Sequence, residues 1–379
     1  HSLIASLATT GGGAFFTVYL LKAGVSIPGA LLSLAAMFLL RLVIRGFLLV
    51  IAVRTGLRWL LIAGSLLMGL SYPFLAEVHG IGAGLFLLVL VVAIADTVYW
   101  PTYHAYFAAL GDEEHRGQQL GVREALNATF GIVSPLIAGW LLVSFGPRVA
   151  FVATGVVQAL AALPIFWTPD VPVARHVAGG YRAMLPSAGI FIGDGFSTAG
   201  YVITWQIALF LALDQNFMAY GGALAVAALV GAAGSLVLGR MIDTGSGGRA
   251  VTLSIGLVVI VTFMRASIHA HPALAVAANA LGALVSCLYI PTIMTVVYNR
   301  AKRSPCAMRF HIAAEAGWDI GISLGLIAAA CIVWLGFPVS YSILVSLVGS
   351  AMVFVLLRRY YRDHPGIHIE PINEPVVHP

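Results

Sequence analysis

Long apolar runs, separated by short polar or Gly/Pro breaks, occupy most of the chain. A helix that crosses a bilayer needs about 20 apolar residues, and twelve windows of this kind follow one another. They lie at residues 2–21, 28–53, 59–77, 83–107, 119–144, 148–168, 187–212, 219–242, 250–268, 273–298, 309–334 and 338–358. The runs lack the alternation of barrel strands. The pattern therefore predicts an all-α integral membrane protein with twelve transmembrane helices.

Composition agrees with a membrane protein and excludes several other classes. Hydrophobic residues make up 60% of the 379 and charged residues 9%, whereas soluble domains carry about 25% charged residues. Lipid must therefore be the main solvent. The three cysteines show no metal-ligand or redox spacing, so we expect no metal and no cofactor. The net charge of +5 is spread over short loops, which argues against a nucleic-acid partner.

One polar segment, residues 168–186, divides the predicted spans into two sets of six. We expect an N-terminal six-helix bundle at 1–168, a central loop at 169–186, a C-terminal six-helix bundle at 187–358 and a tail at 359–379. Basic residues gather in the loops on the side of the central loop. The positive-inside rule then predicts that this loop and both termini are cytoplasmic. We expect a monomer in a bacterial inner membrane, with lipid around it.

The two predicted bundles share short matching segments at nearly the same offset. YWPT in the fourth span matches YIPT in the tenth, and RTG after the second span matches DTG after the eighth. The matching positions are 99–102 with 289–292, 54–56 with 243–245, and Arg123 with Arg309. Because they lie at equivalent points of two six-span halves, they indicate an internal duplication, which predicts two pseudo-symmetric bundles.

The loops after the second and eighth spans carry a further pattern. The second copy keeps Gly239 and Asp243, whereas in the first copy Val53 precedes Arg54. With this loop, the chain resembles the major facilitator superfamily, whose loop reads roughly G-x-x-x-D-R-x-G-R-R with the aspartate at the position of Val53. The fifth span also resembles that family's antiporter-type pattern, through Gly131, Pro135 and Gly139. The resemblance covers the whole chain and implies transport by alternating access.

In that family the loop aspartate lies against the start of a helix of the other half and helps to close the cytoplasmic side. A carboxylate at a helix N-terminus contributes roughly 0.3–1 kcal/mol. The resemblance gives this role to Asp243, acting near Arg123, or Asp243 only caps its own loop. Together with charged residues at the starts of the fifth and eleventh spans, the predicted gating residues are Arg54, Arg58, Arg123, Glu124, Asp243 and Arg309.

Two arginines stand inside the second predicted span, four residues apart on one helix face. Each costs roughly 2.5–3.5 kcal/mol at a helix centre, so Arg41 and Arg45 should face the bundle interior and find partners. Asp96 in the fourth span is the candidate partner. Two guanidinium groups facing one carboxylate leave a surplus positive charge, which favours an anionic substrate group. Alternatively, the Asp96 pair is structural and Arg45 pairs with loop carboxylates or extends toward the cytoplasm.

In the second half, Asp194 lies between glycines in the seventh span, which suggests a broken or closely packed helix. Tyr201, Trp205 and Gln206 follow at helical spacing, either as a ligand site or as packing. Arg265, His269 and His271 lie near the outer end of the ninth span, where we expect them at the membrane interface. The predicted substrate-binding residues are Arg41, Arg45, Asp96, Tyr99, Trp100, Asp194, Tyr201, Trp205 and Tyr289.

Three titratable residues share one face of the eleventh span, namely His311, Glu315 and Asp319. Two close carboxylates cannot both ionise cheaply in a low dielectric, so one of them should hold a proton. With Asp96 and Asp194, these three form the predicted proton-coupling set. Alternatively, Arg309 and Arg303 neutralise the two carboxylates as a gate. His104 is either a proton relay or a packing residue.

The chain has no GxxxxGK[ST] loop, so ATP hydrolysis is not expected. We expect a secondary active transporter, not an enzyme, that uses protons as its coupling ion and moves a small anionic or amphipathic organic molecule. Export is favoured because the fifth span is antiporter-like. An exporter of divalent metal ions, with Asp96, Asp194 and histidines as ligands, is the first alternative. A membrane-embedded lipid-modifying enzyme and a transporter-like receptor are alternatives of another class.

Overall fold

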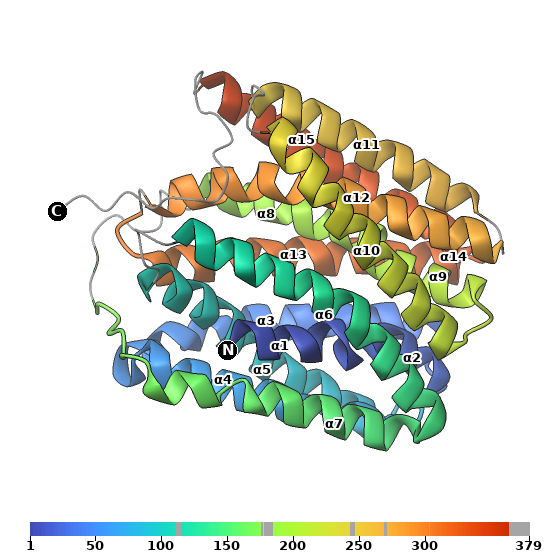
Figure 1. Cartoon of the computed structure of the whole chain (residues 1–379), viewed down its shortest axis with the longest axis horizontal. Helices are drawn as coiled ribbons and strands as arrows, with labels where there is room; N and C mark the ends of the chain where they lie inside the picture. The colour runs from blue at the N-terminus through green and yellow to red at the C-terminus, as the bar shows by residue number, and fades with distance from the viewer. Residues whose placement is uncertain are drawn as a thin grey trace.

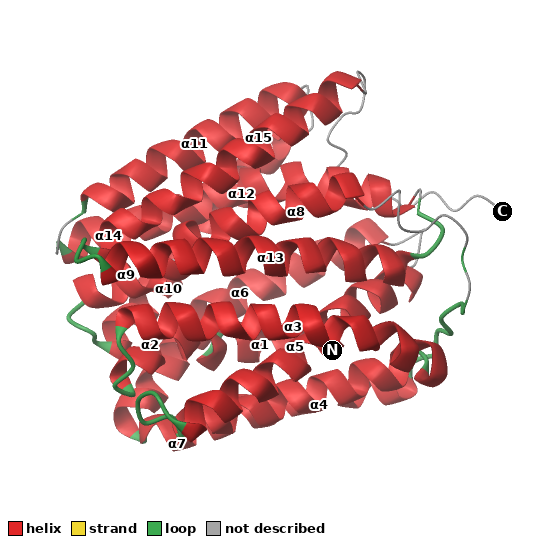
Figure 2. Ribbon diagram, turned by 180° about the vertical axis from the view of Figure 1, so that it is seen from behind, coloured by secondary structure: helices red, strands yellow, loops and turns green. Residues whose placement is uncertain are grey.

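A computed structural model of the chain describes residues 1–110, 116–175, 177, 185–242, 247–268, 271–302 and 304–363. Over these residues it contains helices, turns and loops (Figure 2). The first half comprises α1 (Ser2–Thr10), η1 (Gly12–Phe15), α2 (Phe16–Lys22), α3 (Ile27–Thr55), α4 (Leu57–Ala76), α5 (Ala83–Leu110), α6 (Arg116–Ser144), α7 (Gly146–Leu160) and η2 (Leu163–Trp167).

The second half has the same general layout. It comprises α8 (Leu185–Thr198), the π-helix η3 (Ala199–Thr204), α9 (Trp205–Ala212), α10 (Phe217–Ile242), α11 (Gly247–Ser267), α12 (Pro272–Lys302), α13 (Ala307–Trp334), α14 (Val339–Ser342), η4 (Ile343–Val345) and α15 (Ser346–Asp363). The long helices run side by side along the longest axis of the molecule (Figure 1).

Eleven of the helical stretches in the described part of the chain are long and apolar enough to cross a membrane. A shorter apolar stretch, Thr129–Ser144, belongs to α6 and corresponds to the fifth predicted span. The predicted all-α membrane fold is confirmed, with the eleven span candidates and α6 in the places of the twelve predicted helices, and the predicted ends agree closely. The second span, for example, was expected at 28–53 and is the helix Ile27–Thr55.

Local sequence sets the ends of α3, the helix that carries the two arginines. Ser26 caps its N-terminus by accepting a hydrogen bond from the Gly29 N–H at 3.2 Å, and Pro28 occupies the first turn. The helix ends at Gly56, whose φ of 74° is readily adopted only without a side chain. The next helix, α4, begins immediately after this turn.

Small residues bring α8 and α13 unusually close. A Cβ atom at Gly195, Gly317 or Gly321 would collide with the backbone of the facing helix. Such close approach of backbones is how helices pack in lipid, where burial of apolar area gives little driving force. Between the two halves of the chain, α3 packs on α13 and α6 packs on α10. Helix α13 therefore lies between α3 and α8 and contacts both.

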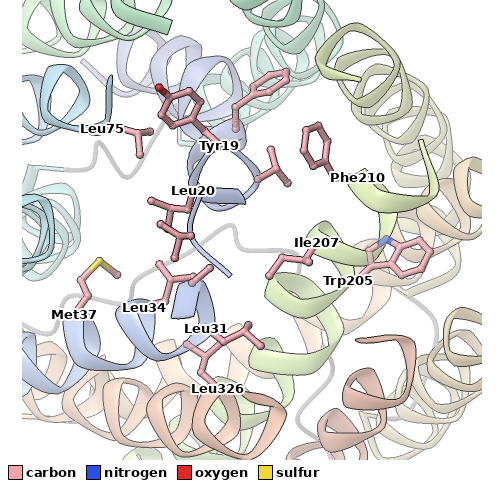
Figure 3. Close-up of a cluster of buried hydrophobic side chains, with 14 of the residues drawn as sticks. Tyr19, Leu20, Leu31, Leu34, Met37, Leu75, Trp205, Ile207, Phe210 and Leu326 are labelled. Atoms are coloured by element: carbon pink, nitrogen blue, oxygen red, sulfur yellow. The ribbon is translucent and has the colours of Figure 1, made fainter. Parts of the chain in front are cut away.

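The apolar core differs between the two ends of the bundle. At the end away from the central loop, one cluster joins both halves, with Tyr19, Leu31 and Leu34 facing Phe210 and Leu326 (Figure 3). At the end near the central loop, two clusters replace it. One belongs chiefly to the first half and the other to the second. We call these the opposite end and the central-loop end.

Candidate functional site

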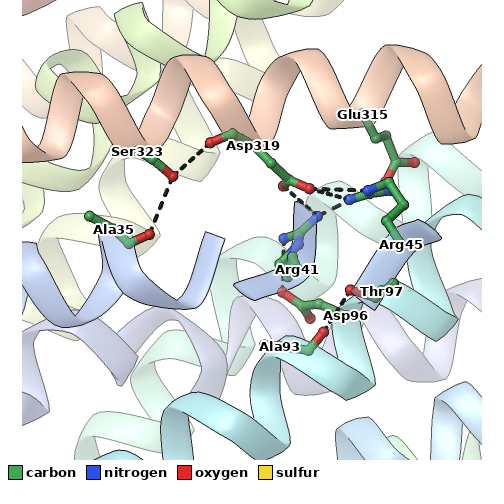
Figure 4. Close-up of polar contacts among 9 residues, drawn as sticks. All are labelled: Ala35, Arg41, Arg45, Ala93, Asp96, Thr97, Glu315, Asp319 and Ser323. Carbon is green, nitrogen blue, oxygen red and sulfur yellow. Dashed lines mark hydrogen bonds and ion pairs between the residues drawn. The ribbon is translucent and has the colours of Figure 1, made fainter. Parts of the chain in front are cut away.

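Five charged side chains from three helices meet in the middle of the molecule. Arg41 and Arg45 come from α3, Asp96 from α5, and Glu315 and Asp319 from α13 (Figure 4). We refer to these five residues as the central cluster. Arg41 is 4% exposed and Arg45 is 2% exposed, so both guanidinium groups are effectively removed from solvent. The cluster joins the first half of the chain to the second.

Asp319 is the shared partner of both arginines. Its Oδ1 lies 3.2 Å from Arg41 Nη2, and its Oδ2 accepts hydrogen bonds from Arg45 Nη2 at 2.6 Å and Nε at 3.1 Å. Glu315 Oε2 accepts from Arg45 Nη1 at 2.8 Å, and Asp96 Oδ2 accepts from Arg41 Nη1 at 3.1 Å. The pairing of Arg45 with one face of α13 is nearly bidentate, the strong form of such contacts.

The cluster confirms one sequence expectation and overturns two. Asp96 does pair with Arg41. The expectation that Arg45 pairs with loop carboxylates or extends toward the cytoplasm is wrong, because α13 supplies both of its partners. The expected surplus of positive charge is also wrong. Three carboxylates face two guanidinium groups, so the cluster carries one excess negative charge when every member is ionised.

Three buried polar atoms of the cluster have no hydrogen-bond partner among the described residues, namely Glu315 Oε1, Arg41 Nε and Asp319 Oδ1. Asp319 Oδ1 still lies 3.2 Å from Arg41 Nη2 as an ion pair. Aromatic rings cover the cluster, with the Arg41 guanidinium 5.1 Å from the Phe38 ring and 5.9 Å from that of Trp318. A buried carboxylate oxygen without a partner can accept a proton, which removes the excess negative charge.

A pair of histidines lies one helical turn from Glu315 toward the central-loop end. The His311 ring of α13 stacks on the His104 ring of α5, with centroids 5.5 Å apart and planes inclined by 24°. His104 also stacks on Trp100 at 6.0 Å. The three residues predicted on one face of α13 thus contact different groups. Glu315 and Asp319 bind Arg45, whereas the His311 ring contacts the His104 ring of the other half.

Comparisons with known proteins identify the family and the fold. The family model of the Major Facilitator Superfamily matches residues 2–187. The chain belongs to the major facilitator superfamily. The solved structure of an auto-inhibited POT family peptide transporter matches with a TM-score of 0.59 and 14% sequence identity, and the match covers 96% of each chain. At that identity the likeness shows the fold alone. No curated protein matches.

Membership of this family settles the general activity. The protein is a multi-pass integral membrane protein and a secondary transporter of a small molecule. The family is generally non-enzymatic, which confirms the expectation that the protein is not an enzyme. The fold match extends over 96% of the chain and so includes both of its halves.

The second half of the transporter holds a separate acidic group. Tyr289 of α12 donates a hydrogen bond from its hydroxyl to Asp194 Oδ1 at 2.9 Å. The side chain of Trp318 lies near the same carboxylate. Since Trp318 is the residue that lies over Arg41, one side chain of α13 links Asp194 to the central cluster. Sequence analysis named Asp194 and Tyr289 but gave no role to Trp318.

Tyr201 and Trp205 surround an arginine instead of continuing the face of Asp194. The Arg265 guanidinium lies 4.3 Å from the Tyr201 ring and 4.6 Å from the Trp205 ring. It donates to the carbonyls of Tyr201 at 2.6 Å and Ala278 at 3.4 Å. The expectation that Arg265 lies at the membrane interface is wrong, because the side chain is 3% exposed and packs inside the second half.

A local irregularity explains how Arg265 is accommodated. Residues Ala199–Thr204 form a π-helix, in which the wider turn disturbs the usual hydrogen bonds and leaves carbonyl groups available. The Tyr201 carbonyl in this turn accepts the short bond from Arg265. The Trp205 indole N–H in turn donates to Asn279 at 3.0 Å. We refer to Tyr201, Trp205, Arg265 and Asn279 as the Arg265 site.

At the central-loop end, Asp170 supplies a carboxylate that sequence analysis missed. Its Oδ1 accepts a hydrogen bond from the Arg58 backbone N–H at 2.9 Å and so caps the start of α4. Gly56 leaves room for it, since a Cβ there would collide with the Asp170 carboxylate. The Arg58 side chain donates to the Thr168 carbonyl at 3.1 Å, and the Arg54 side chain is exposed.

Of the other predicted gating residues, Arg309 has contacts that the structure describes, whereas the side chains of the rest are not among those described. Arg309 donates to the carbonyls of Ala174 and Arg175 at 3.2 and 2.7 Å. The alternative in which Arg309 neutralises Glu315 and Asp319 is therefore wrong, and Arg45 takes that position. The remaining residues, whose side chains lie outside those described, are Arg123, Glu124, Asp243, His269 and Arg303.

Proposed function

We propose that the transporter exchanges protons for a small amphipathic organic molecule and works as an exporter. The observation that carries this proposal is the excess carboxylate of the central cluster. An uncompensated charge in a low-dielectric interior is costly. Either a proton or a positively charged group of the substrate compensates it. Because the two compensate the same charge, they exclude one another, as the two partners of an antiporter do.

Glu315 is the member best suited to bind the proton. Its side chain is 11% exposed, whereas that of Asp319 is fully buried. Its Oε1 has no partner among the described residues, and its Oε2 holds a single short bond to Arg45. Protonation of Glu315 therefore weakens one contact between α3 and α13 while Asp319 continues to hold both arginines. The stacked His104 and His311 offer a route for protons from the central-loop end.

Proton binding is thereby linked to alternating access. Helices α3 and α13 belong to opposite halves, and the halves rock against each other in transporters of this architecture. The contact between Arg45 and α13 holds them together at the middle of the membrane. We propose that residues 1–168 and 187–358 are the moving halves and that the central loop is cytoplasmic. A protonated Glu315 then favours the state in which α3 and α13 separate.

The net negative charge of the fully ionised central cluster supports a different class of substrate from the anionic one expected from the sequence. The argument for an anionic substrate required surplus positive charge, which the central cluster lacks. An amphipathic molecule with a basic group is better supported, because aromatic residues accompany the carboxylates along their helices. Tyr99 and Trp100 follow Asp96 by about one turn on α5, and Trp318 precedes Asp319 on α13. Export of divalent metal ions has less support, since Asp96 binds Arg41 and Asp194 binds Tyr289.

Proton binding can be measured without knowing the substrate. Purified protein in weakly buffered detergent solution is shifted from basic to acidic pH, and proton uptake is followed with an indicator dye. We expect Glu315→Gln to take up about one proton fewer than the parent protein, because the amide cannot titrate. The shift ends at mildly acidic pH, where an exposed carboxylate stays ionised, so Glu77→Gln is the matched control, since Glu77 is exposed and pairs with Arg148 at the opposite end. Equal uptake by parent and Glu315→Gln would disprove the assignment.

Coupling requires a flux measurement. Proteoliposomes are loaded with a panel of labelled amphipathic amines and small carboxylates, and efflux is compared under inward, outward and abolished pH gradients. We expect efflux of an amine to accelerate when protons can move in the opposite direction, and the gradient dependence to disappear in Glu315→Gln. Identical efflux under all three gradients would rule out proton coupling. Gradient-driven movement of carboxylates alone would rule out the substrate class.

A further inference from the structure

A surface groove lies between α11 and α15, away from the central cluster. It has a volume of about 580 Å³, within the range of ordinary ligand sites. The two helices pack side by side at one edge of the molecule (Figure 1). Both are long and apolar enough to span the membrane, so the groove opens toward lipid.

The groove has a charged end and an apolar length. Arg249 in the first turn of α11 and Arg358 near the end of α15 both line it, and both are exposed. Leu253, Leu257 and Ile260 continue along α11 from this charged end toward the middle of the membrane. The order of groups matches a phospholipid, with a phosphate at the membrane surface and an acyl chain below it.

Two features make this a shaped site instead of an ordinary lipid-facing surface. Arg358 reaches across to α11 and donates to Thr252 Oγ1 at 3.2 Å and to the Gly248 carbonyl at 3.4 Å, which fixes its position beside Arg249. Gly256 lines the groove halfway along, and a Cβ there would meet no atom within 4 Å. The missing side chain provides the space for an acyl chain.

Within the described part of the chain, the positive charge at this end is not balanced by an ion pair. Among the residues that the structure describes, no carboxylate forms an ion pair with Arg249 or Arg358, whereas Arg359 and Arg362 both contact Asp363. Acyl chains gain little by leaving other lipid for an apolar protein surface, since the two environments are alike. Selection of one lipid over another must therefore come from the headgroup, and two guanidinium groups select a negative one.

We propose that the groove between α11 and α15 is a binding site for one anionic phospholipid, held by Arg249 and Arg358 at its phosphate. The site is independent of the proposed transport mechanism, because none of its residues belongs to the central cluster or the Arg265 site. A bound lipid contacts α11 and α15 together, so it also ties the two helices of the second half at the central-loop end.

Lipid titration with native mass spectrometry tests this site. The full chain in detergent is titrated with phosphatidylglycerol and, separately, with phosphatidylcholine carrying the same acyl chains. We expect the first bound phosphatidylglycerol to be retained more tightly than the first phosphatidylcholine. Arg249→Gln and Arg358→Gln should each weaken the binding of that phosphatidylglycerol about fivefold. Arg359→Gln is the matched control, since it removes the same charge from the same helix end outside the groove. It should leave retention unchanged.

A further variant and a competitor distinguish specific lipid binding in the groove from general electrostatic attraction and from loss of folding. Gly256→Leu fills the groove while keeping both arginines, and we expect this variant to weaken the binding of phosphatidylglycerol as well. Inorganic phosphate at millimolar concentration should not displace the lipid, because it lacks the acyl chain. Equal retention of the two lipids, an equal loss in Arg359→Gln, or displacement by phosphate would each overturn the proposal. The comparison of the two lipids on the parent protein decides the question even where a variant fails to fold.

Discussion

Arg45 and Arg265 are both buried in the membrane-spanning part of the transporter, but different groups surround them. Arg45 binds the carboxylates of Glu315 and Asp319, which belong to the other half of the chain. Arg265 binds two backbone carbonyls and lies between two aromatic rings, and its partners all belong to its own half. One site joins the two halves of the chain through titratable groups, and the other uses groups that do not change charge.

The difference separates two ways of keeping a cation in a low-dielectric interior. A carboxylate partner can be protonated, so the pairing responds to pH and can be broken during a transport cycle. Carbonyl dipoles and ring faces give a smaller but permanent stabilisation. We infer that the ionic contacts of the central cluster break and re-form during transport, whereas the contacts of the Arg265 site persist. Substitutions at both sites and at the surface test this inference.

Asp319→Asn should have the largest effect. The substitution keeps the shape of the side chain but removes the charge that Arg41 and Arg45 share. Breaking a buried ion pair by removing one partner costs about 3–5 kcal/mol, so the free energy of unfolding should fall by about that amount. Thermal unfolding in detergent measures it, and transport should be lost. Adding Arg45→Met should not restore stability, because Arg45 still pairs with Glu315 in the single variant and its removal leaves that carboxylate without a partner. A single variant as stable as the parent would contradict the prediction.

Arg265→Leu should have a smaller effect that does not depend on pH. The variant loses a desolvated cation–π contact worth about 2 kcal/mol and two hydrogen bonds to carbonyls. Because none of these partners titrates near neutrality, the loss in unfolding free energy should be the same at mildly acidic and mildly basic pH. Arg265→Lys is the control that keeps the charge without the planar stacking. A pH-dependent loss would remove the contrast with the central cluster.

Asp170→Ala should have a moderate effect at the surface of the central-loop end. Loss of a helix cap costs about 1 kcal/mol, and here the cap is the bond from the Arg58 N–H to Asp170. Hydrogen exchange of the first amides of α4 should accelerate, while those of α13 should not change. Asp170→Asn should retain most of the protection, because its amide oxygen can still accept the bond. Unchanged exchange in Asp170→Ala would show that Asp170 does not cap α4.

The fold followed from the sequence because a membrane limits the choices. Apolar length alone identifies a spanning helix, and so α3 was expected within a few residues of its observed ends. The pairing of Arg41 with Asp96 was also predictable, since both lie inside spans of the same half at similar depth. Matching depth within one bundle was enough to suggest a contact.

The rest of the site could not be predicted because it depends on packing between distant helices. Which face of α13 meets Arg45 is decided by the contact of α3 with α13, and that contact follows from the close approach of α13 to α8 at Gly317 and Gly321. Arg265 was misplaced because a π-helix has no clear sequence signal, and without it the Tyr201 carbonyl would not be available. Asp170 could not be predicted because it lies in the central loop, and no local pattern shows that this loop packs against the start of α4.

Arg148→Gln should have the smallest effect and defines the lower limit of the series. Arg148 and Glu77 form a contact of 2.8 Å, as short as that between Arg45 and Glu315. Their side chains are 77% and 51% exposed, however, so water and salt screen the attraction and the pair contributes about 0–1 kcal/mol. Thermal unfolding at low and high salt measures the difference, which we expect to vanish at high salt. A loss as large as that of Asp319→Asn would mean that distance, and not burial, sets the strength of these ion pairs.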